Sequence, residues 1–446
     1  MTRSHILPIC HMSPMCPIIL LPMKDTLHPS TQILERNISK LSGKILVINP
    51  PELSSIATIE AKIPKSKITV SCQHFDLFSE AKEAGYKSYF ETHHVPKTLF
   101  DTVIVFLPKS DAEIEMVLAW SNECLDKSGQ LILIGQNNAG IKSAKKTLEK
   151  LIGPITFTDN ARHSAFYVSN KTVKLKKFKL DDYWQSYRIN VGSIIPDSTS
   201  PRGKSGIQHL KTLDPGPRAG MTEEEGLRVY SLPGTFSHSK LDEGTSLLLA
   251  SLQSKVDLSQ TKTALDWGCG AGPLGLALTL IRRSIKVDMV DSSAEALASA
   301  EKTIKENALT NCEVFASNVF SGVKEKYDLI VANPPFHKGH STSYIASETF
   351  IKTSKQYLTE HGHMVIVANV FLHYETLLEE QFGYVKTLVK TNKYKILEVI
   401  NEPVREVRES RKEKKRRPKR TLEEAGFIDI NDLDKVIVED TDTFDD

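Results

Sequence analysis

One pattern of residues occurs twice in this chain of 446 residues. The first copy is FDTVIVFLPKS at 100–110 followed by KSGQLILIGQN at 127–137, and the second is YDLIVANPPFH at 327–337 followed by EHGHMVIVANV at 360–370. Each copy opens with an aromatic residue and aspartate, continues as an apolar strand that ends at proline, and reaches a second apolar strand after a helix-length segment. Apolar strands that alternate with such segments are typical of βαβ units. The sequence therefore predicts an α/β protein with two tandem domains of similar plan, each built on a mostly parallel sheet.

Composition excludes several classes of protein. Hydrophobic residues make up 40% of the chain and charged residues 25%, which permits a large packed core. No run of about 18 uncharged apolar residues is present, so no transmembrane helix and no membrane partner are expected. The six cysteines show no paired CxxC spacing, which argues against a disulfide scaffold and a structural zinc site. The formal net charge of +2 favours no partner by itself, and we expect a soluble, cytoplasmic protein.

Shifts in composition divide the chain into five segments. Residues 1–22 are interrupted by four prolines, which predicts a disordered extension, with Met23 as an alternative start. Residues 192–226 hold six glycines and four prolines, as is typical of a flexible insertion. Beyond residue 402 a basic block precedes an acidic block, as is typical of solvated tails. The expected segments are the extension 1–22, a first domain 23–185, a linker or insertion 186–230, a second domain 231–402 and a tail 403–446.

The two copies differ where a ligand would bind. Ligands of open α/β sheets bind outside the carboxyl ends of the strands. At this place the second copy has Asn333-Pro334-Pro335-Phe336, whereas the first has FLPK at 106–109. A similar NPP at 49–51 follows a different strand and lacks the aromatic residue. We therefore expect catalysis in the second copy and a degenerate first copy.

A glycine-rich turn marks the start of the second domain. In TALDWGCGAGPLGLALTL at 263–280, a strand leads into Gly268, Gly270 and Gly272, which let the backbone turn sharply and approach a ligand closely. Pro273 suits the first turn of a helix. The free N–H groups at that helix N-terminus favour a carboxylate or phosphate.

Two aspartates indicate which cofactor this turn binds. The next strand, KVDMVDSS, ends at Asp291, whose carboxylate can accept from the ribose hydroxyls of a nucleoside cofactor. The glycine spacing alone also matches the dinucleotide fingerprint, which is a weak signal. Asp266, two residues before Gly268, can orient the turn and face a sulfonium, although it can also be a simple cap of the turn. Together with the Asn-Pro-Pro-Phe motif, it favours S-adenosylmethionine over NAD.

The Asn-Pro-Pro-Phe motif suits methyl transfer to the exocyclic amine of a base. Such an amine is a poor nucleophile because its lone pair is delocalised into the ring. The side-chain oxygen of Asn333 and the carbonyl of Pro334 can accept its two protons, while Pro335 stiffens the turn. Phe336 can stack on a flipped base. We predict these four residues to be catalytic and expect no metal, whereas a bland proline turn is the alternative.

Longer stretches carry a family resemblance. LPGTFSHSKLDEGTSLLL, LDWGCGAGPLGLAL, VFASNVFSGVKEKYDLIVANPPFHKG and VANVFLHYETLLEEQFG resemble the RsmC family, the small-subunit (16S) ribosomal RNA guanine-N2 methyltransferases. The likeness is nearly continuous over 232–400 and weaker over 33–184, and is absent from the extension, the insertion and the tail. It implies two tandem Rossmann-like class I methyltransferase domains, of which the N-terminal one is degenerate and binds RNA and the C-terminal one is catalytic.

The resemblance also implies a substrate and further site residues. It implies S-adenosylmethionine-dependent methylation of guanine N2, at position 1207 of 16S rRNA in the 30S subunit, by a protein that we expect to be a monomer. The glycine turn would hold the methionine part of the cofactor, Asp291 its ribose and Asn318 its adenine, with the segment of Phe236 and Gly244 packed over it. The predicted cofactor-binding residues are thus Asp266, Gly268, Gly270, Gly272, Asp291, Asn318, Phe236 and Gly244.

Several alternatives stay open at this point. A large-subunit rRNA guanine-N2 methyltransferase shares the tandem plan, and adenine N6 or a protein glutamine amide are other substrates for an NPP motif. A non-catalytic RNA-binding protein is a rival of another class. The basic segments 142–179 and 405–420 are candidates for contact with RNA phosphates, and either can also be ordinary solvated surface.

Overall fold

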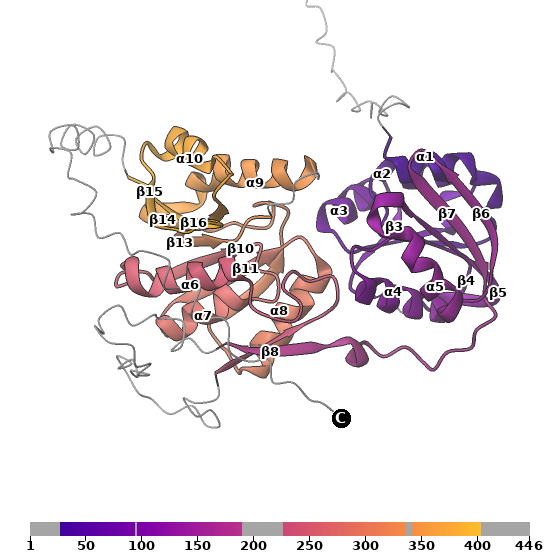
Figure 1. The fold of residues 1–446 in the computed structure, drawn as a ribbon, viewed down its shortest axis with the longest axis horizontal. Coiled ribbons are helices and arrows are strands. Elements are labelled where there is room, and N and C mark those ends of the chain that lie inside the picture. Colours follow the sequence, from indigo (N-terminus) through magenta and orange to yellow (C-terminus); the bar gives the residue numbers. More distant parts are fainter. Residues whose placement is uncertain (1–26, 94–95, 190–225, 336–340, 403–446) are drawn as a thin grey trace, which may run out of the picture.

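The computed structural model describes residues 27–93, 96–189, 226–335 and 341–402, without the side chains of 341–344. The expected extension 1–22, most of the linker 186–230 and the tail 403–446 lie outside the described residues. Figure 1 shows two α/β units side by side, one from each half of the chain.

The N-terminal half is a seven-stranded sheet in the order β3-β2-β1-β4-β5-β7-β6. The pairs from β3 to β5 are parallel, and β7 pairs antiparallel with β5 and β6. The strands are β1 (Ile45–Ile48), β2 (Ile68–Cys72), β3 (Lys87–Phe90), β4 (Phe100–Phe106), β5 (Leu125–Gln136), β6 (Ile155–Ala161) and β7 (Ser164–Asn170). The helices are α1 (Pro29–Arg36), α2 (Leu53–Glu60), α3 (Phe75–Glu83), α4 (Asp111–Cys124) and α5 (Ile141–Leu151).

The C-terminal half repeats this plan in the order β12-β11-β10-β13-β14-β16-β15, again with only β16 antiparallel to its neighbours. The strands are β10 (Thr263–Trp267), β11 (Lys286–Asp291), β12 (Cys312–Ala316), β13 (Tyr327–Ala332), β14 (Leu358–Asn369), β15 (Lys386–Lys390) and β16 (Tyr394–Ile400). The helices are α6 (Glu243–Lys255), α7 (Pro273–Ile281), α8 (Ala294–Glu306), α9 (Ser341–Ser354) and α10 (Tyr374–Phe382). The prediction of two tandem α/β domains with mostly parallel sheets is confirmed.

Alternate residues of the central strands feed two cores, one on each face of each sheet. In the N-terminal sheet Val47 packs with α1, α2 and α3, whereas its neighbour Leu46 packs with α4 and α5. In the C-terminal sheet Ala264 packs with α6, α7 and α8, whereas Leu265 packs with α9 and α10. Helices on both faces bury the central strands, which explains why these strands are apolar almost throughout.

A short antiparallel pair leads from one half to the other. Its strands are β8 (Gln185–Ile189) and β9 (Leu227–Ser231), which flank the part of the linker outside the described residues. The β9 strand is fixed to α8, because the N–H of Tyr230 donates to Thr303 Oγ1 at 2.9 Å and that of Arg228 donates to Asn307 Oδ1 at 3.1 Å. The pair therefore packs with the C-terminal half.

The two halves touch through the turns that follow β2 and β11. His74 and Ser293 form an antiparallel bridge. The N–H of Phe75 donates to the Ser292 carbonyl at 2.8 Å, and the N–H of Ala294 donates to the Gln73 carbonyl at 2.9 Å. Across the described part of the chain, no helix has both the length and the apolar character needed to cross a membrane.

Candidate active site at the strand ends of the C-terminal half

The glycine-rich turn leaves β10 and enters α7. Gly268, Gly270 and Gly272 all have positive φ, at 70°, 55° and 83°, which favours glycine over any residue with a Cβ. The N–H groups of Gly268 and Cys269 both donate to the Val290 carbonyl, which fixes the turn to the end of β11. A Cβ added at Gly268 would meet no atom within 4 Å, so the turn has an open face.

Asp266 lies beneath this turn and is fully buried. Its Oδ2 accepts the N–H of Gly275, in the first turn of α7, at 2.8 Å. The pKa of Asp266 is raised to about 7, chiefly by burial, which the hydrogen bond from Gly275 partly offsets and to which the nearby charge of Asp291 adds. Its Oδ1 has no hydrogen-bond partner among the described residues. Asp266 therefore attaches the start of α7 to the end of β10 through one carboxylate oxygen, and its other oxygen accepts no hydrogen bond from a described residue.

Asp291, the last residue of β11, binds the glycine turn from the other side. Its Oδ2 accepts the N–H of Gly270 and its Oδ1 accepts the N–H of Ser293, both at 2.9 Å. Burial raises the pKa of Asp291, while these backbone hydrogen bonds and His74 of the N-terminal half lower it. This carboxylate is thus held rigidly next to the turn.

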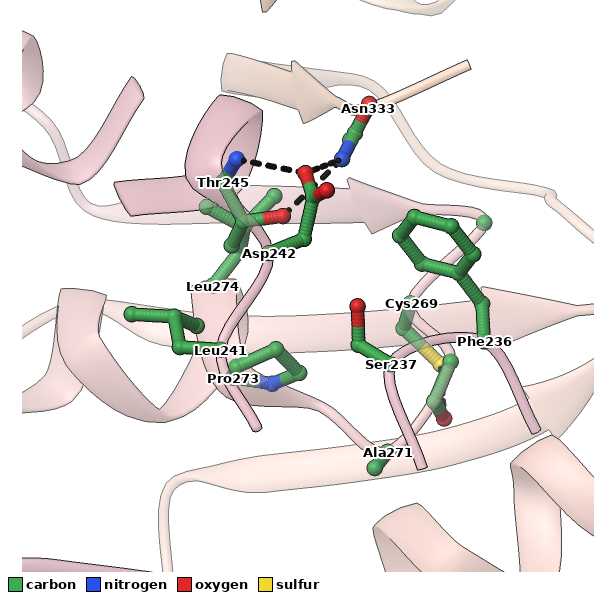
Figure 2. A pocket seen from close by; sticks show the side chains of 12 residues that line it. Phe236, Ser237, Leu241, Asp242, Thr245, Cys269, Ala271, Pro273, Leu274 and Asn333 are labelled. Atoms are coloured by element: carbon green, nitrogen blue, oxygen red, sulfur yellow. Dashed lines mark hydrogen bonds between the residues drawn. The ribbon is translucent and has the colours of Figure 1, made fainter. Parts of the chain in front are cut away.

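Asn333 follows the last residue of β13. Its Nδ2 donates to Asp242 Oδ2 at 3.0 Å and to Thr245 Oγ1 at 2.9 Å, and Figure 2 shows its oxygen turned away from both. This Oδ1 is buried and accepts no hydrogen bond from any described residue. The carbonyl of Pro335 accepts from Ser347 Oγ at 3.3 Å, which attaches the proline turn to α9. The strand end therefore presents one buried acceptor that no described residue satisfies.

A small pocket open to solvent joins these elements (Figure 2). Of the predicted site residues, Phe236, Gly268, Gly270 and Asn333 line it directly. The other lining residues are Ser237, Leu241, Asp242, Thr245, Cys269, Ala271, Pro273 and Leu274.

The remaining predicted residues lie around this pocket or outside the described residues. Gly272 is the N-cap of α7, and Gly244 lies in the first turn of α6, where an added Cβ would be 3.0 Å from Asp242 Oδ2. Asn318 is exposed beyond the end of β12. Pro334 is buried at the end of β13. Phe336 lies outside the described residues.

Asp242 and Thr245 are among the pocket residues that were not predicted as site residues. Asp242 is the N-cap of α6 and accepts the N–H of Thr245 at 3.1 Å, so the sequence does carry a signal for a helix start here. Their contact with Asn333 could not be predicted in this way, because Asn333 lies 91 residues from Asp242 and nothing in the neighbouring residues indicates the contact. Among the described residues no group of three or more His, Cys, Asp or Glu side chains is arranged to hold a metal ion.

Comparison with protein families defines the class to which this fold and site belong. The Methyltransferase small domain matches residues 226–398, and the Methyltransferase small domain N-terminal matches residues 31–187. The two matches coincide with the two α/β halves, and the pocket lies wholly within the C-terminal match, residues 226–398. The chain is thus a methyltransferase with two related halves.

Relatives along the whole chain define the particular family. The chain is 34% identical over 369 residues to "Ribosomal RNA small subunit methyltransferase C" of Aliivibrio salmonicida, which covers 82% of this chain and 97% of the relative. It is 35% identical over 372 residues to the protein of the same name from Actinobacillus succinogenes, covering 83% and 98%. The chain belongs to the ribosomal RNA small subunit methyltransferase C family.

A solved structure has the same two-part fold. The "16S rRNA N2 G1207 methyltransferase (RsmC)" of T. thermophilus, in complex with AdoMet and guanosine, superposes with a TM-score of 0.68 at 22% identity. The match covers 84% of this chain and 93% of that one, so it includes both halves.

Proposed function

We propose that this protein transfers the methyl group of S-adenosylmethionine to the exocyclic N2 of a guanine in 16S rRNA. Membership of the family and the likeness to an enzyme with this printed activity support the proposal. The observation that carries it is the amide of Asn333, whose Oδ1 is a buried acceptor without a described partner at the end of β13.

The residues around the pocket fit the cofactor. The open face of the glycine turn leaves room for a ligand near the backbone, and Asp266 Oδ1 is a buried acceptor without a described partner. We propose that Gly268, Gly270 and Gly272 hold the methionine part and that Asp291 accepts from the ribose. S-adenosylmethionine supplies an electrophilic methyl group on a sulfonium.

We propose four further cofactor contacts and supports. Asp266 fixes the turn and faces the methionine end, and Asn318, at the exposed end of β12, lies near the adenine. Phe236 and the segment that reaches Gly244 pack over the cofactor, in keeping with the position of Phe236 in the lining of the pocket.

The Asn-Pro-Pro-Phe turn would align the guanine amine. Asn333 Oδ1 and the Pro334 carbonyl accept its two N–H protons, which directs the nitrogen lone pair to the methyl carbon. The bond from N2 to carbon forms as the carbon–sulfur bond breaks, and the alkylated nitrogen releases one proton to solvent. Pro335 stiffens the turn and Phe336 stacks on the base. No strong base is required for this reaction.

We propose that the two halves divide the work as the segments 23–185 and 231–402 suggest, with RNA binding in the first and catalysis in the second. The exposed lysines of α5 support an RNA-binding role, since lysine clusters release counterions from phosphates. We further propose a monomer in the cytoplasm that acts on guanine 1207 within the 30S subunit.

Mass mapping of ribosomal RNA tests this function. RNA from cells with and without the protein should differ by one methyl group on the N2 of a single guanine of 16S rRNA. A missing methyl group in large-subunit RNA, on an adenine, or in no RNA at all would contradict the proposal. Addition of the purified full chain and S-adenosylmethionine to the unmethylated small subunit should restore the lost mass.

A further inference from the structure

We infer that Asp242 and Thr245 are positioning residues for Asn333, holding its amide in the orientation that presents Oδ1 to the substrate amine. This inference rests on the proposed methyl transfer and adds the residues that set the direction of its acceptor. The three side chains come from two elements, since Asp242 and Thr245 belong to the start of α6 and Asn333 follows β13.

The contacts use both protons of the Asn333 amide. One N–H points to Asp242 Oδ2 at 3.0 Å and the other to Thr245 Oγ1 at 2.9 Å. The same Oδ2 also accepts the N–H of Thr245 at 3.1 Å, so one carboxylate oxygen joins the helix start and the strand end. Thr245 therefore contacts Asp242 through its backbone and Asn333 through its hydroxyl.

The chemistry of these partners excludes the rotated amide. A carboxylate oxygen only accepts, and Asp242 Oδ2 is already the acceptor for a backbone N–H. Rotation of the Asn333 amide by 180° would bring its oxygen against this acceptor, with no proton between them. The pair thus selects one of two orientations that otherwise have the same shape.

The selected orientation is the one that the reaction needs. Because both N–H groups of Nδ2 donate hydrogen bonds, Oδ1 points the other way, where it is buried and has no described partner. A buried acceptor in this state is destabilised until a donor arrives, and the amine of a bound guanine is such a donor. A rotated amide would offer a second donor to the amine instead, which cannot hold its lone pair in line.

Three substitutions separate positioning from helix capping. Asp242→Ser keeps a good N-cap but is too short to hold Asn333, whereas Asp242→Asn keeps the cap and an oxygen that can accept both hydrogen bonds. Thr245→Val removes only the hydroxyl. The matched control is Glu243→Gln, because Glu243 is the adjacent acid but points outward and pairs with Lys393 at the surface at 3.2 Å.

The assay is single-turnover methyl transfer by the full chain from labelled S-adenosylmethionine to small-subunit rRNA from cells that lack the protein. Asp242→Ser should lower the rate of transfer by about 10- to 100-fold, as expected for a misplaced reacting group. The cofactor dissociation constant and the melting temperature should stay at the wild-type values. Thr245→Val should lose less, and Asp242→Asn and Glu243→Gln should keep most of the wild-type rate.

Three results would overturn the inference: a wild-type rate in Asp242→Ser, an equal loss in Asp242→Asn, or a loss that appears as weaker cofactor binding instead of slower transfer. A double variant with Asn333→Ala gives a further readout. Positioning through Asn333 predicts no added loss from Asp242→Ser in that background, whereas a merely structural role would add its full loss.

Asn333→Ala alone distinguishes this inference from the proposed function. If it transfers methyl groups at the wild-type rate, the proposed role of Asn333 and the inference fail together. If it is slow while Asp242→Ser is fast, the proposed function stands and only the positioning role is overturned.

Discussion

The two halves of this molecule have the same strand order, but they differ in the polarity of the side chains at their strand ends. Ile45 of β1 pairs with Thr102 of β4, and Ala264 of β10 pairs with Leu329 of β13, so the central strands correspond residue by residue. The same holds for β2 and β11, which flank β1 and β10. The register therefore identifies the N-terminal counterpart of each site residue.

At each corresponding position the C-terminal half has a polar side chain and the N-terminal half an apolar or poorly ionised one. The pairs are Asp266 with Val47, Asp291 with Cys72, and Asn333 with Phe106. The turn after β1 has Asn49 with a φ of 53°, where the C-terminal half has Gly268 with a φ of 70°. The two turns share only this first position, because Gly270 and Gly272 also have positive φ whereas no residue from Pro50 to Leu53 does. The N-terminal half also lacks the polar side chains found at the C-terminal strand ends.

The N-terminal half uses the same edge of its sheet for contact with the other half. His74 and Ser293 are themselves corresponding residues, so their bridge resembles the self-complementary contact of a two-fold dimer. Next to it, an added Cβ at Gly234 would be 3.0 Å from the Glu113 carboxyl carbon. The corresponding edges of the two sheets therefore meet at this bridge.

The largest expected effect is on catalysis at Asn333. Asn333→Ala should lower the rate of methyl transfer by about 100- to 1000-fold, the loss typical for a removed hydrogen-bonding group that acts in a transition state. Cofactor affinity should change little. Phe106→Leu, at the corresponding position of the N-terminal half, should transfer methyl groups at the wild-type rate. Unimpaired turnover in Asn333→Ala would refute the asymmetry between the halves.

The next effect concerns stability and Asp266. Its folded-state pKa of about 7 lies above the ordinary 3.8, so its contribution to stability is complete below pH 3.8 and is lost as the pH rises to 7. Asp266→Asn cannot ionise and keeps an oxygen for the Gly275 N–H. Its free energy of unfolding should therefore exceed that of the wild type by roughly 4 kcal/mol at pH 8, since the two pKa values lie about three units apart and each unit corresponds to about 1.4 kcal/mol.

Urea unfolding from pH 4 to pH 8 measures this difference. The excess should shrink toward zero at the acidic end, where the wild-type Asp266 is protonated. An excess that does not vary with pH would mean that burial does not perturb this carboxyl. Val47, the counterpart of Asp266 in the N-terminal half, is not ionisable. The pH-dependent gain in stability is therefore expected only for the C-terminal position.

A smaller effect is expected on cofactor binding. Asp291→Ala should raise the dissociation constant of S-adenosylmethionine by about 10- to 100-fold, since a hydrogen bond to a charged group contributes about 1.5–3 kcal/mol. Cys72→Ala, at the corresponding position, should leave it unchanged. Calorimetry should also give one cofactor per chain. Equal constants for the Asp291→Ala and wild-type proteins, or two sites per chain, would contradict the assignment.

The smallest effect is expected on RNA affinity. Reversal of Lys145 and Lys146, both exposed on α5, to glutamate should weaken RNA binding several-fold and reduce the salt-dependence slope by about one for each lysine. The control reverses Lys305 and Lys324, which are exposed in the C-terminal half. If the two double variants lose RNA affinity to the same extent, the N-terminal half has no special role in RNA binding.

Much of this fold could be predicted because its signals are local. The repeated strands end at corresponding prolines, and the structure places them as β4 and β13, followed by β5 and β14. The glycine turn lies between β10 and α7, as its residues predict. The β8–β9 pair and the bridge between the halves were not predicted, because their partners lie far apart in the sequence and carry no periodic pattern.

The sequence by itself determined the two sheets, the open glycine turn and which half carries polar strand ends, because backbone preference and side-chain identity act at the residue where they occur. Only the tertiary structure decided the direction of the Asn333 amide and the raised pKa of Asp266. Both depend on atoms brought from distant segments and on removal of water, and neither is written in the neighbouring residues.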